Sequence, residues 1–380
     1  MNFAEMDFRL IIDGEKVDGC DTMPVIDPAT GTAFARTPRA DAAQLDSAVD
    51  AAARAFPAWS ALSVDERRAA MLKLADALEA KAELLTRLLI AEQGKPMAEA
   101  QYEVGGTIGL LRGFTSFDIA PKTLRKDETT HIVGHRTPLG VVAVITPWNF
   151  PLMLLISKFG PALLTGNTIV AKPAPSTPLT SLLLGEIAAG VLPRGVVNVI
   201  VDDNDLGDRL SGHPGVAKVA FTGSTATGKQ VMRSAASTIK RLTLELGGND
   251  AALILEDADP KAAAAAVFAS AMMNAGQVCV AAKRVYAPES LYDAVCDELA
   301  LIASNTVVDA GIRQGTQMGP VQNAKQYDRL RDLMEDTRAA GRIVAGGDIP
   351  DGPGYFVPPT IVRDIADDAR LVREEQFGPI

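Results

Sequence analysis

Short apolar runs alternate with stretches of helical spacing between residues 139 and 246, and this rhythm constrains the fold more than any other feature. The runs, rich in valine, isoleucine and leucine, cover residues 139–146, 167–173, 196–201, 216–223 and 241–246. Strands of this length that alternate with helices predict a parallel sheet with helices on both faces. In such doubly wound α/β sheets, ligands bind beyond the carboxyl ends of the strands. Residues that directly follow these runs are therefore the first candidates for a functional site.

Helices are expected between residues 41 and 117, before this region, and mixed α/β structure is expected after it. A chain of 380 residues also predicts two or more domains. We expect the second unit to begin near Asn249, and the polar segment 121–137 to leave the main body. The helix at 177–190 is expected to have Thr177 as its cap and Pro178 in its first turn. Apolar spacing and composition predict further helices at 41–91, 98–117, 151–166, 260–274 and 290–304, and strands at 250–257 and 284–290.

Composition and charge exclude several classes of function. The formal net charge of −10 argues against a nucleic-acid-binding surface. No apolar run approaches the roughly 18 residues that span a bilayer, and the first residues lack the pattern of a secretory signal. The three cysteines, at positions 20, 279 and 296, have no metal-ligand spacing. We therefore expect no metal site, and a reducing cytoplasm as the location.

The segment from Phe221 to Lys229, FTGSTATGK, ends one predicted strand and opens a helix. Glycines let backbone amides approach phosphate oxygens, and a helix N-terminus favours negative charge. The segment is neither a dinucleotide-binding GxGxxG nor a complete Walker motif, because Gln230 follows the lysine. Phosphate binding and an ordinary turn both fit this segment.

The segment TPWNFP, from Thr146 to Pro151, follows the first strand of the series. Its two prolines restrict the backbone around Asn149, whose side-chain amide could donate to a developing oxyanion. An asparagine that caps a helix at a strand–helix turn fits the same pattern.

Glu245 and Cys279 are two further candidates for chemistry. Glu245 ends an apolar run, and a glutamate held in largely apolar surroundings can serve as a general base; a pairing with a nearby arginine is the alternative. Cys279 follows a predicted helix and a Gly-Gln turn, where a thiolate could act as a nucleophile. Most single cysteines are instead small buried hydrophobes, as we expect for Cys296.

Four of these segments, TPWNFP, FTGST, ELGG and GQVC, occur in an order that closely resembles the aldehyde dehydrogenase superfamily. Glu245 and Cys279 lie 34 residues apart, which also fits that family. The segments GPALLTGNTIVAKP (160–173), EQGKP (92–96), GP (319–320) and EEQFGP (374–379) agree as well. The resemblance runs from about residue 10 to the end of the chain.

The resemblance implies a fold with three parts. A Rossmann-type parallel-sheet domain that binds NAD(P) would comprise residues 1–120 and 138–248, and an α/β catalytic domain would comprise residues 249–380. Residues 121–137 would form a small oligomerisation β-segment, which implies a homodimer or homotetramer. Members of the family continue beyond the position of Ile380, so the catalytic domain is expected to be incomplete in this chain.

The resemblance also implies a reaction, the oxidation of an aldehyde to a carboxylic acid with NAD(P)⁺. Cys279 would form a thiohemiacetal whose oxyanion is held by the Asn149 amide and the Cys279 backbone N–H. Glu245 would then activate water to hydrolyse the thioester. Lys158 matches a lysine near the family's catalytic centre, although a helix-surface lysine would look the same.

Cofactor contacts follow from the same resemblance. NAD is the expected cofactor, and NADP stays open because Pro175 stands where NAD-preferring members often carry a glutamate. The implied contacts are Lys172 with the adenosine ribose, Gly223 and Ser224 with the pyrophosphate, Trp148 and Leu246 along the cofactor path, Glu375 with the nicotinamide ribose and Phe377 against the nicotinamide ring.

The substrate is specified only in outline. The residues near Asn149 and Cys279 are largely apolar, and no arginine presents itself for a substrate carboxylate, which favours an aliphatic or aromatic aldehyde. These residues are Phe150, Leu152, Met153, Leu154, Ser157, Val278 and Val280. Two other functions stay open: a non-catalytic, cofactor-binding remnant, and a coenzyme A-acylating aldehyde dehydrogenase, whose branch of the family lacks the equivalent of Glu245.

Overall fold

The computed structural model describes residues 2–380, which divide into two compact units. Unit 1 comprises the residues up to Pro24, Arg36–Leu85 and Tyr102–Glu245. Unit 2 comprises Val25–Ala35, Thr86–Gln101 and Leu246–Ile380. The elements along which the chain passes from one unit to the other are β3 (Asp21–Asp27), β4 (Thr32–Arg39), α3 (Ala82–Gln93) and α4 (Met97–Phe114).

Unit 1 is built on a seven-stranded sheet in the order β11-β10-β7-β8-β9-β1-β2. Its strands are β1 (Leu10–Ile12), β2 (Glu15–Val17), β7 (Val141–Ile145), β8 (Thr168–Lys172), β9 (Val197–Val199), β10 (Val216–Thr222) and β11 (Arg241–Glu245). Neighbours from β7 to β11 pair in parallel, whereas β1 pairs antiparallel with both β9 and β2. Every residue of β7 and β8 is buried, as expected for strands covered on both faces. The predicted doubly wound α/β sheet is confirmed.

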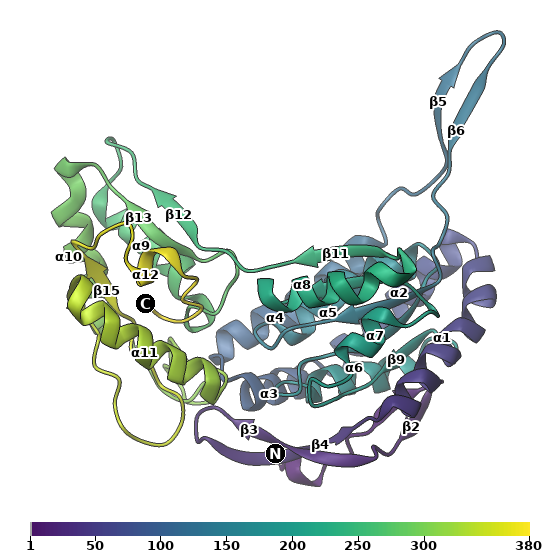
Figure 1. Cartoon of the computed structure of the whole chain (residues 1–380), viewed down its shortest axis with the longest axis horizontal. Helices are drawn as coiled ribbons and strands as arrows, with labels where there is room; N and C mark the ends of the chain where they lie inside the picture. Colours follow the sequence, from purple (N-terminus) through teal and green to yellow (C-terminus); the bar gives the residue numbers. More distant parts are fainter. Residues whose placement is uncertain (1) are drawn as a thin grey trace. The chain divides into compact units, whose positions relative to one another are not determined.

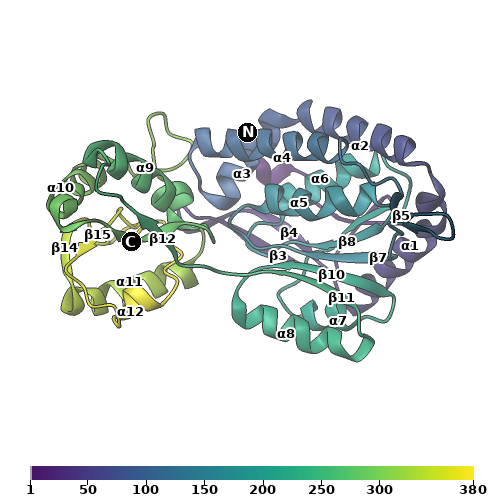
Figure 2. The ribbon, with the colours of Figure 1, turned by 90° about the horizontal axis from the view of Figure 1, so that it is seen from above.

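Helices cover both faces of this sheet. Figure 2 shows α5 and α6 on one face of the parallel strands and α7 and α8 on the other. The helices of unit 1 are α1 (Ala42–Ala61), α2 (Val64–Glu79), α5 (Pro151–Leu164), α6 (Leu179–Ala189), α7 (Gly207–Gly212) and α8 (Thr225–Ala235), with short 3₁₀ turns at Phe3–Glu5 and Ala236–Thr238. Within residues 2–380, no helix combines the length and apolarity needed to cross a membrane.

Local sequence explains where several of these helices begin. Asp41 with Gln44 forms a capping box at α1, and Ser63 with Glu66 forms another at α2. The expected cap of α6 is wrong: the helix begins at Leu179, and Pro178 stands at the cap position without a side-chain cap hydrogen bond. The reason is a turn closed by the Thr177 N–H on the Ala174 carbonyl at 3.2 Å, which leaves Thr177 ahead of the cap position.

The first four strands were not predicted from the sequence. β1 and β2 have three residues each, and β2, with sequence EKV, is mostly exposed. A strand this short has no periodicity to detect. Pairing of Ile11 with Val199 on β9 makes β1 part of the main sheet.

The polar segment 121–137 contains a separate antiparallel hairpin, visible in Figure 1. It consists of β5 (Lys122–Lys126) and β6 (His131–Gly134), and all residues of β5 are exposed.

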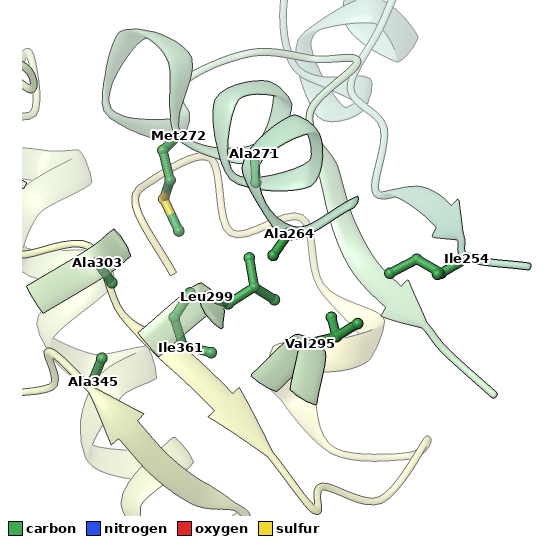
Figure 3. Packing of buried hydrophobic residues seen from close by; sticks show 9 residues of the cluster. All are labelled: Ile254, Ala264, Ala271, Met272, Val295, Leu299, Ala303, Ala345 and Ile361. Carbon is green, nitrogen blue, oxygen red and sulfur yellow. The ribbon is translucent and has the colours of Figure 1, made fainter. Parts of the chain in front are cut away.

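Unit 2 contains two small sheets and its own apolar core. β12 pairs in parallel with β13, and β14 pairs antiparallel with β15. Figure 3 shows Ala264, Ala271 and Met272 from α9 packed with Val295 and Leu299 from α10. The elements are β12 (Asp250–Leu253), α9 (Pro260–Met272), a 3₁₀ turn at Met273–Gly276, β13 (Ala282–Tyr286), α10 (Glu289–Asn305), α11 (Ala324–Ala340), β14 (Arg342–Ala345), β15 (Ile361–Arg363) and α12 (Arg370–Arg373).

Two segments from the first 101 residues cluster with unit 2 rather than with the sheet of unit 1. The Pro28 carbonyl accepts from Tyr355 N–H at 2.9 Å, and the Met97 N–H donates to the Gly311 carbonyl at 3.1 Å. Both segments, 25–35 and 86–101, lie within the range that the sequence assigned to the first domain. Helical spacing shows which face of a helix is apolar but not which unit covers that face.

Lys283 on β13 ties the last residues of the chain to α9. Its Nζ donates to the carbonyls of Ala271 and Gly378, each at 2.7 Å, and lies 3.3 Å from the Ile380 carbonyl. Burial lowers the pKa of this ammonium group to about 7.

This burial predicts a pH-dependent stability. The ordinary lysine pKa is about 10.4, so above pH 7 the unfolded chain keeps a proton that the folded chain has lost. The free energy of unfolding should then rise with pH between these values, by up to about 1.4 kcal/mol per pH unit, and fall as the pH drops towards 7. In urea unfolding at pH 7, 8 and 9, the free energy of unfolding of wild type should rise with pH relative to that of Lys283→Met. A pH-independent difference would contradict the prediction.

Candidate active site

The carboxyl ends of β7, β8, β10 and β11 bring together the site residues predicted in unit 1. β7 and β10 are neighbours, with Ile145 opposite Phe221, and the strand order reverses between them. Ligands in doubly wound sheets bind at such a switch point. At this edge, Trp148 and Asn149 follow β7, Lys172 ends β8, Pro175 follows it, Gly223 and Ser224 follow β10, and Glu245 ends β11.

Asn149 lies in the turn between β7 and α5, and it is only 3% exposed. It is not a helix cap, because Phe150 occupies the cap position of α5 and makes no side-chain cap hydrogen bond. Trp148, beside it, and Lys158, on α5, are both half-buried. The structure therefore removes the capping alternative for Asn149.

Glu103 on α4 holds the first turn of α5, and sequence reasoning missed it. Its Oε1 accepts from the Leu152 N–H at 3.0 Å and from the Met153 N–H at 3.2 Å, and Glu103 is completely buried. A carboxylate in this place satisfies amides that have no acceptor within the helix and favours the positive end of the helix dipole. Glu103 thus fixes the backbone that directly follows Asn149.

Removal of this carboxylate should destabilise unit 1. We expect Glu103→Leu to lower the free energy of unfolding by about 2–3 kcal/mol, because one buried and one half-buried N–H group lose their acceptor. Glu103→Gln keeps an oxygen at the same position and should cost less. Urea unfolding of the three proteins measures the difference, and equal losses in the two variants would contradict this role.

Gly223 and Ser224 connect β10 to α8. Ser224 is the cap of α8, and its Oγ accepts from the Thr227 N–H at 3.2 Å. A Cβ at position 223 would lie 2.6 Å from Cζ of Phe221, so the glycine is needed for this close packing. The turn leaves the first amides of an 11-residue helix at the carboxyl edge of the sheet, where a phosphate could accept from them.

Glu245 is the last residue of β11 and is exposed, which differs from the largely apolar surroundings that we expected. Its backbone is fixed by pairing opposite Thr222 and by its carbonyl, which accepts from the Gly223 N–H at 3.1 Å. The glutamate and the turn after β10 are therefore neighbours on adjacent strands.

Lys172 is buried and paired with a carboxylate that the sequence did not single out. Its Nζ lies 2.5 Å from Oδ1 of Asp202, and their side chains are 6% and 0% exposed. Pro175, three residues after Lys172, is half-buried.

Cys279 lies in unit 2, in a turn that follows an unusual backbone. Asn274 and Ala275, both buried, have φ values of 53°, and Gly276 follows with a φ of 70°. The left-handed region is unfavourable for residues other than glycine, and such strain is typical of functional sites. Cys279 is half-buried, whereas Cys20 is exposed and Cys296 is buried.

Polar side chains, two of them the buried glutamines Gln277 and Gln322, hold this backbone in place. The Asn274 N–H donates to the Glu99 carboxylate at 3.0 Å, and the Gln277 Nε2 donates to the Asn274 carbonyl at 2.7 Å. The Gln277 Oε1 accepts from the Gln322 N–H at 2.9 Å, and the Gln322 Nε2 donates to the Glu92 carbonyl at 3.0 Å. Sequence reasoning missed this network, although the motifs GQVC and EQGKP contain two of its members.

Within unit 2, the two glycines of the ELGG segment meet the EEQFGP segment beside this turn. Glu375 Oε1 accepts from the Gly248 N–H at 3.1 Å, and burial raises the pKa of its carboxyl group. A Cβ at Gly248 would lie 2.5 Å from the Cys279 carbonyl oxygen. Phe377 is half-buried with a φ of 52°, and its carbonyl accepts from the Gln326 Nε2 at 3.0 Å.

The predicted site residues therefore form two groups. Asn149 and Glu245 belong to the carboxyl edge of the sheet in unit 1. Leu246, Cys279, Glu375 and Phe377 belong to unit 2. A cavity of about 280 Å³ between α9, α10, β13 and β15 includes none of these residues in its lining. Across the described residues 2–380, no cluster of three histidine, cysteine or acidic side chains could hold a metal ion.

Comparisons with known proteins agree on one family. The model of the Aldehyde dehydrogenase family matches residues 16–380. The chain is 40% identical over 375 residues to a probable aldehyde dehydrogenase from Pseudomonas sp. This match covers 98% of this chain and 77% of that protein. It is 37% identical to the succinate-semialdehyde dehydrogenase (NADP(+)) GabD of Escherichia coli strain K12, with 98% and 79% covered.

A solved structure gives the same result for the fold. The NAD+ complex of aldehyde dehydrogenase from Bacillus cereus matches with a TM-score of 0.96 and 37% identity, over 100% of this chain and 79% of that one. The resemblance and the fold class that the ordered motifs predicted are confirmed. The chain belongs to the aldehyde dehydrogenase family.

Proposed function

We propose that this aldehyde dehydrogenase oxidises an aldehyde to the carboxylic acid with Cys279 as its nucleophile. The observation that carries the assignment is the turn before Cys279, where three successive buried residues with positive φ are held by buried amide side chains. Such a backbone keeps one thiol in a fixed position. The Cys279 Sγ attacks the aldehyde carbon, a C–S bond forms, and the carbonyl oxygen becomes the oxyanion of a thiohemiacetal.

Two donors are assigned to this oxyanion, the side-chain amide of Asn149 and the backbone N–H of Cys279. Asn149 suits this role because the turn that carries it is buried and leads directly into the helix turn held by Glu103. Loss of one such donor costs about 3 kcal/mol in the transition state. Lys158, on α5, is assigned an electrostatic role near this oxyanion.

The residues present fit a nicotinamide dinucleotide. Gly223, Ser224 and the first amides of α8 suit its pyrophosphate, and the ammonium of Lys172 suits the adenosine ribose. Trp148 and Leu246 are assigned to the cofactor path, Glu375 to the nicotinamide ribose and Phe377 to the ring. When bound, NAD(P)⁺ would supply the hydride acceptor for the thiohemiacetal carbon, and loss of that hydride would leave a thioester on Cys279.

Glu245 is assigned the hydrolytic step. Its exposed carboxylate can reach a water molecule, and Leu246, Gly247 and Gly248 follow it. The carboxylate takes a proton from water while the water oxygen attacks the thioester carbonyl. The C–S bond then breaks, the carboxylic acid leaves, and Cys279 regains its thiolate.

An aldehyde panel tests the function. The largely apolar side chains around the proposed centre, including Phe150, Leu152, Met153 and Val278, favour an aliphatic or aromatic aldehyde. Absorbance at 340 nm with NAD and NADP in parallel should show reduction, and the product should be the free acid. A chain that binds NAD yet reduces it with no aldehyde would contradict the proposal. A product formed only as an acyl-coenzyme A would contradict the hydrolytic step.

The hairpin β5–β6 is assigned to contacts between copies of the chain in a homodimer or homotetramer. Its Leu124 is 69% exposed and its Ile132 is 44% exposed. Large apolar side chains that are this exposed to solvent on a hairpin are typical of an interface. Sedimentation of Leu124→Lys should show a smaller assembly than wild type, and Thr123→Lys serves as a matched control. An unchanged assembly would contradict the assignment.

A further inference from the structure

The ion pair between Lys172 and Asp202 lies at the edge of the sheet assigned to the cofactor. β8 and β9 are parallel neighbours, and Lys172 is the last residue of β8. Asp202 follows the end of β9, where the Ile200 N–H donates to the Ala171 carbonyl at 3.0 Å. Both strands therefore deliver a charged side chain to the same place.

Asp202 differs from the other carboxylates of its loop. Its Oδ1 accepts from Lys172 and its Oδ2 accepts from the Leu206 N–H at 2.8 Å, so both oxygens are held in a fully buried position. Asp203 is exposed, and Asp205 is engaged with Arg39 at 2.7 Å. Of the three acidic residues, Asp202 is the one built into the sheet edge.

The pairing changes what Lys172 offers to a nucleotide. A lone ammonium beside the adenosine ribose would attract a 2′-phosphate. The Lys172 ammonium would not, because the Asp202 carboxylate, 2.5 Å away, neutralises its charge. Its remaining N–H groups can still donate to ribose hydroxyls. Pro175 supplies no polar side chain, and the arginine at this loop, Arg39, is already paired with Asp205. The pair and its loop thus present more carboxylates than cations.

We propose that Asp202 sets the preference of this enzyme for a cofactor without a 2′-phosphate. It acts as a positioning residue: it fixes the ammonium of Lys172 and cancels its charge, and it has no need to contact the cofactor. This inference rests on the proposed cofactor site at Lys172. It assigns to Asp202 the discrimination that the proline at position 175 cannot provide.

Calorimetric binding to the 380-residue chain tests the proposal without turnover. Wild type should bind adenosine 5′-monophosphate at least about tenfold more tightly than adenosine 2′,5′-bisphosphate, and NAD more tightly than NADP. Asp202→Asn keeps the size of the side chain and removes its charge, so the ratio of NADP to NAD affinity should rise at least about tenfold. Asp202→Glu keeps the charge and should retain the preference for NAD. Asp203→Asn, the matched control on the exposed neighbour, should leave the ratio unchanged.

Three results would overturn the proposal. A wild-type chain that binds both adenosine phosphates equally has no discrimination to explain. An Asp202→Asn variant that loses NAD and NADP affinity by the same factor shows that Asp202 is only structural. A chain that binds neither adenosine nucleotide removes the cofactor site as well, which distinguishes failure of the proposed function from failure of this inference. If Asp202→Asn does not fold, as circular dichroism would reveal, equal binding of the two adenosine phosphates by wild type would still contradict the proposal.

Discussion

Replacement of Cys279 by alanine is expected to lower the rate of aldehyde-dependent NADH formation by at least about a thousandfold. The reason is that no other cysteine can take its place: Cys20 is exposed in the loop between β2 and β3, and Cys296 is buried on α10 in unit 2. The fold should survive, because Cys279 lies in a turn and its side chain is only half-buried. Absorbance at 340 nm measures the rate, and circular dichroism checks the fold.

Two matched variants make this test specific. Cys20→Ser changes an exposed thiol and should leave the rate unchanged. Glu245→Gln should allow the first hydride transfer, seen as a burst close to one NADH per site, and then stop, because the thioester is not hydrolysed. A Cys279→Ala protein that keeps a tenth of the wild-type rate would contradict the assignment of the nucleophile.

Replacement of Gly276 by alanine is expected to destabilise unit 2 by roughly 3 kcal/mol or more and to abolish activity with it. A Cβ at this position would lie 2.2 Å from the Gly378 carbonyl oxygen and 2.5 Å from Nζ of Lys283. The residue has a φ of 70°, where an alanine is strained whatever the space around it. Because Gly378 is backbone rather than a flexible side chain, the turn that carries Cys279 would have to move.

Gly109 provides the matched control for this substitution. It lies within α4, and a Cβ there would meet nothing within 4 Å. Gly109→Ala should therefore be neutral or stabilise the protein by up to about 1 kcal/mol. Urea unfolding of both variants gives the comparison, and similar losses in the two would contradict the steric argument.

The site was predictable in part, and the residues that escaped prediction share one property. Cys279, Glu245 and Asn149 could be predicted as site residues because each belongs to an ordered motif with turn residues around it. Glu103 and Gln322 act through side-chain hydrogen bonds to backbone that is distant in sequence, the Leu152 N–H in one case and the Glu92 carbonyl in the other. No local pattern reveals such a partner, since the same residue types also occur on solvated helix faces.

The partner of Lys172 escaped prediction for the same reason. The sequence offered Lys172 as a ribose contact and noted that Pro175 provides no carboxylate. Only the pairing of β8 with β9 brings Asp202, 30 residues further along the chain, within 2.5 Å of the lysine. Register between strands is set by packing across the whole sheet, so the sequence of either strand alone could not place the two charges together.

The sequence by itself determined the family, the alternation of strands and helices in the parallel sheet, and the order of the motifs at its carboxyl edge. These features depend on local periodicity and turn chemistry, which are written in consecutive residues. Tertiary structure alone decided that segments 25–35 and 86–101 join unit 2, that β1 extends the sheet, and that Asn149 is not a helix cap. It also decided which buried carboxylates hold the site, because burial and hydrogen bonding across elements exist only once distant parts of the chain have met.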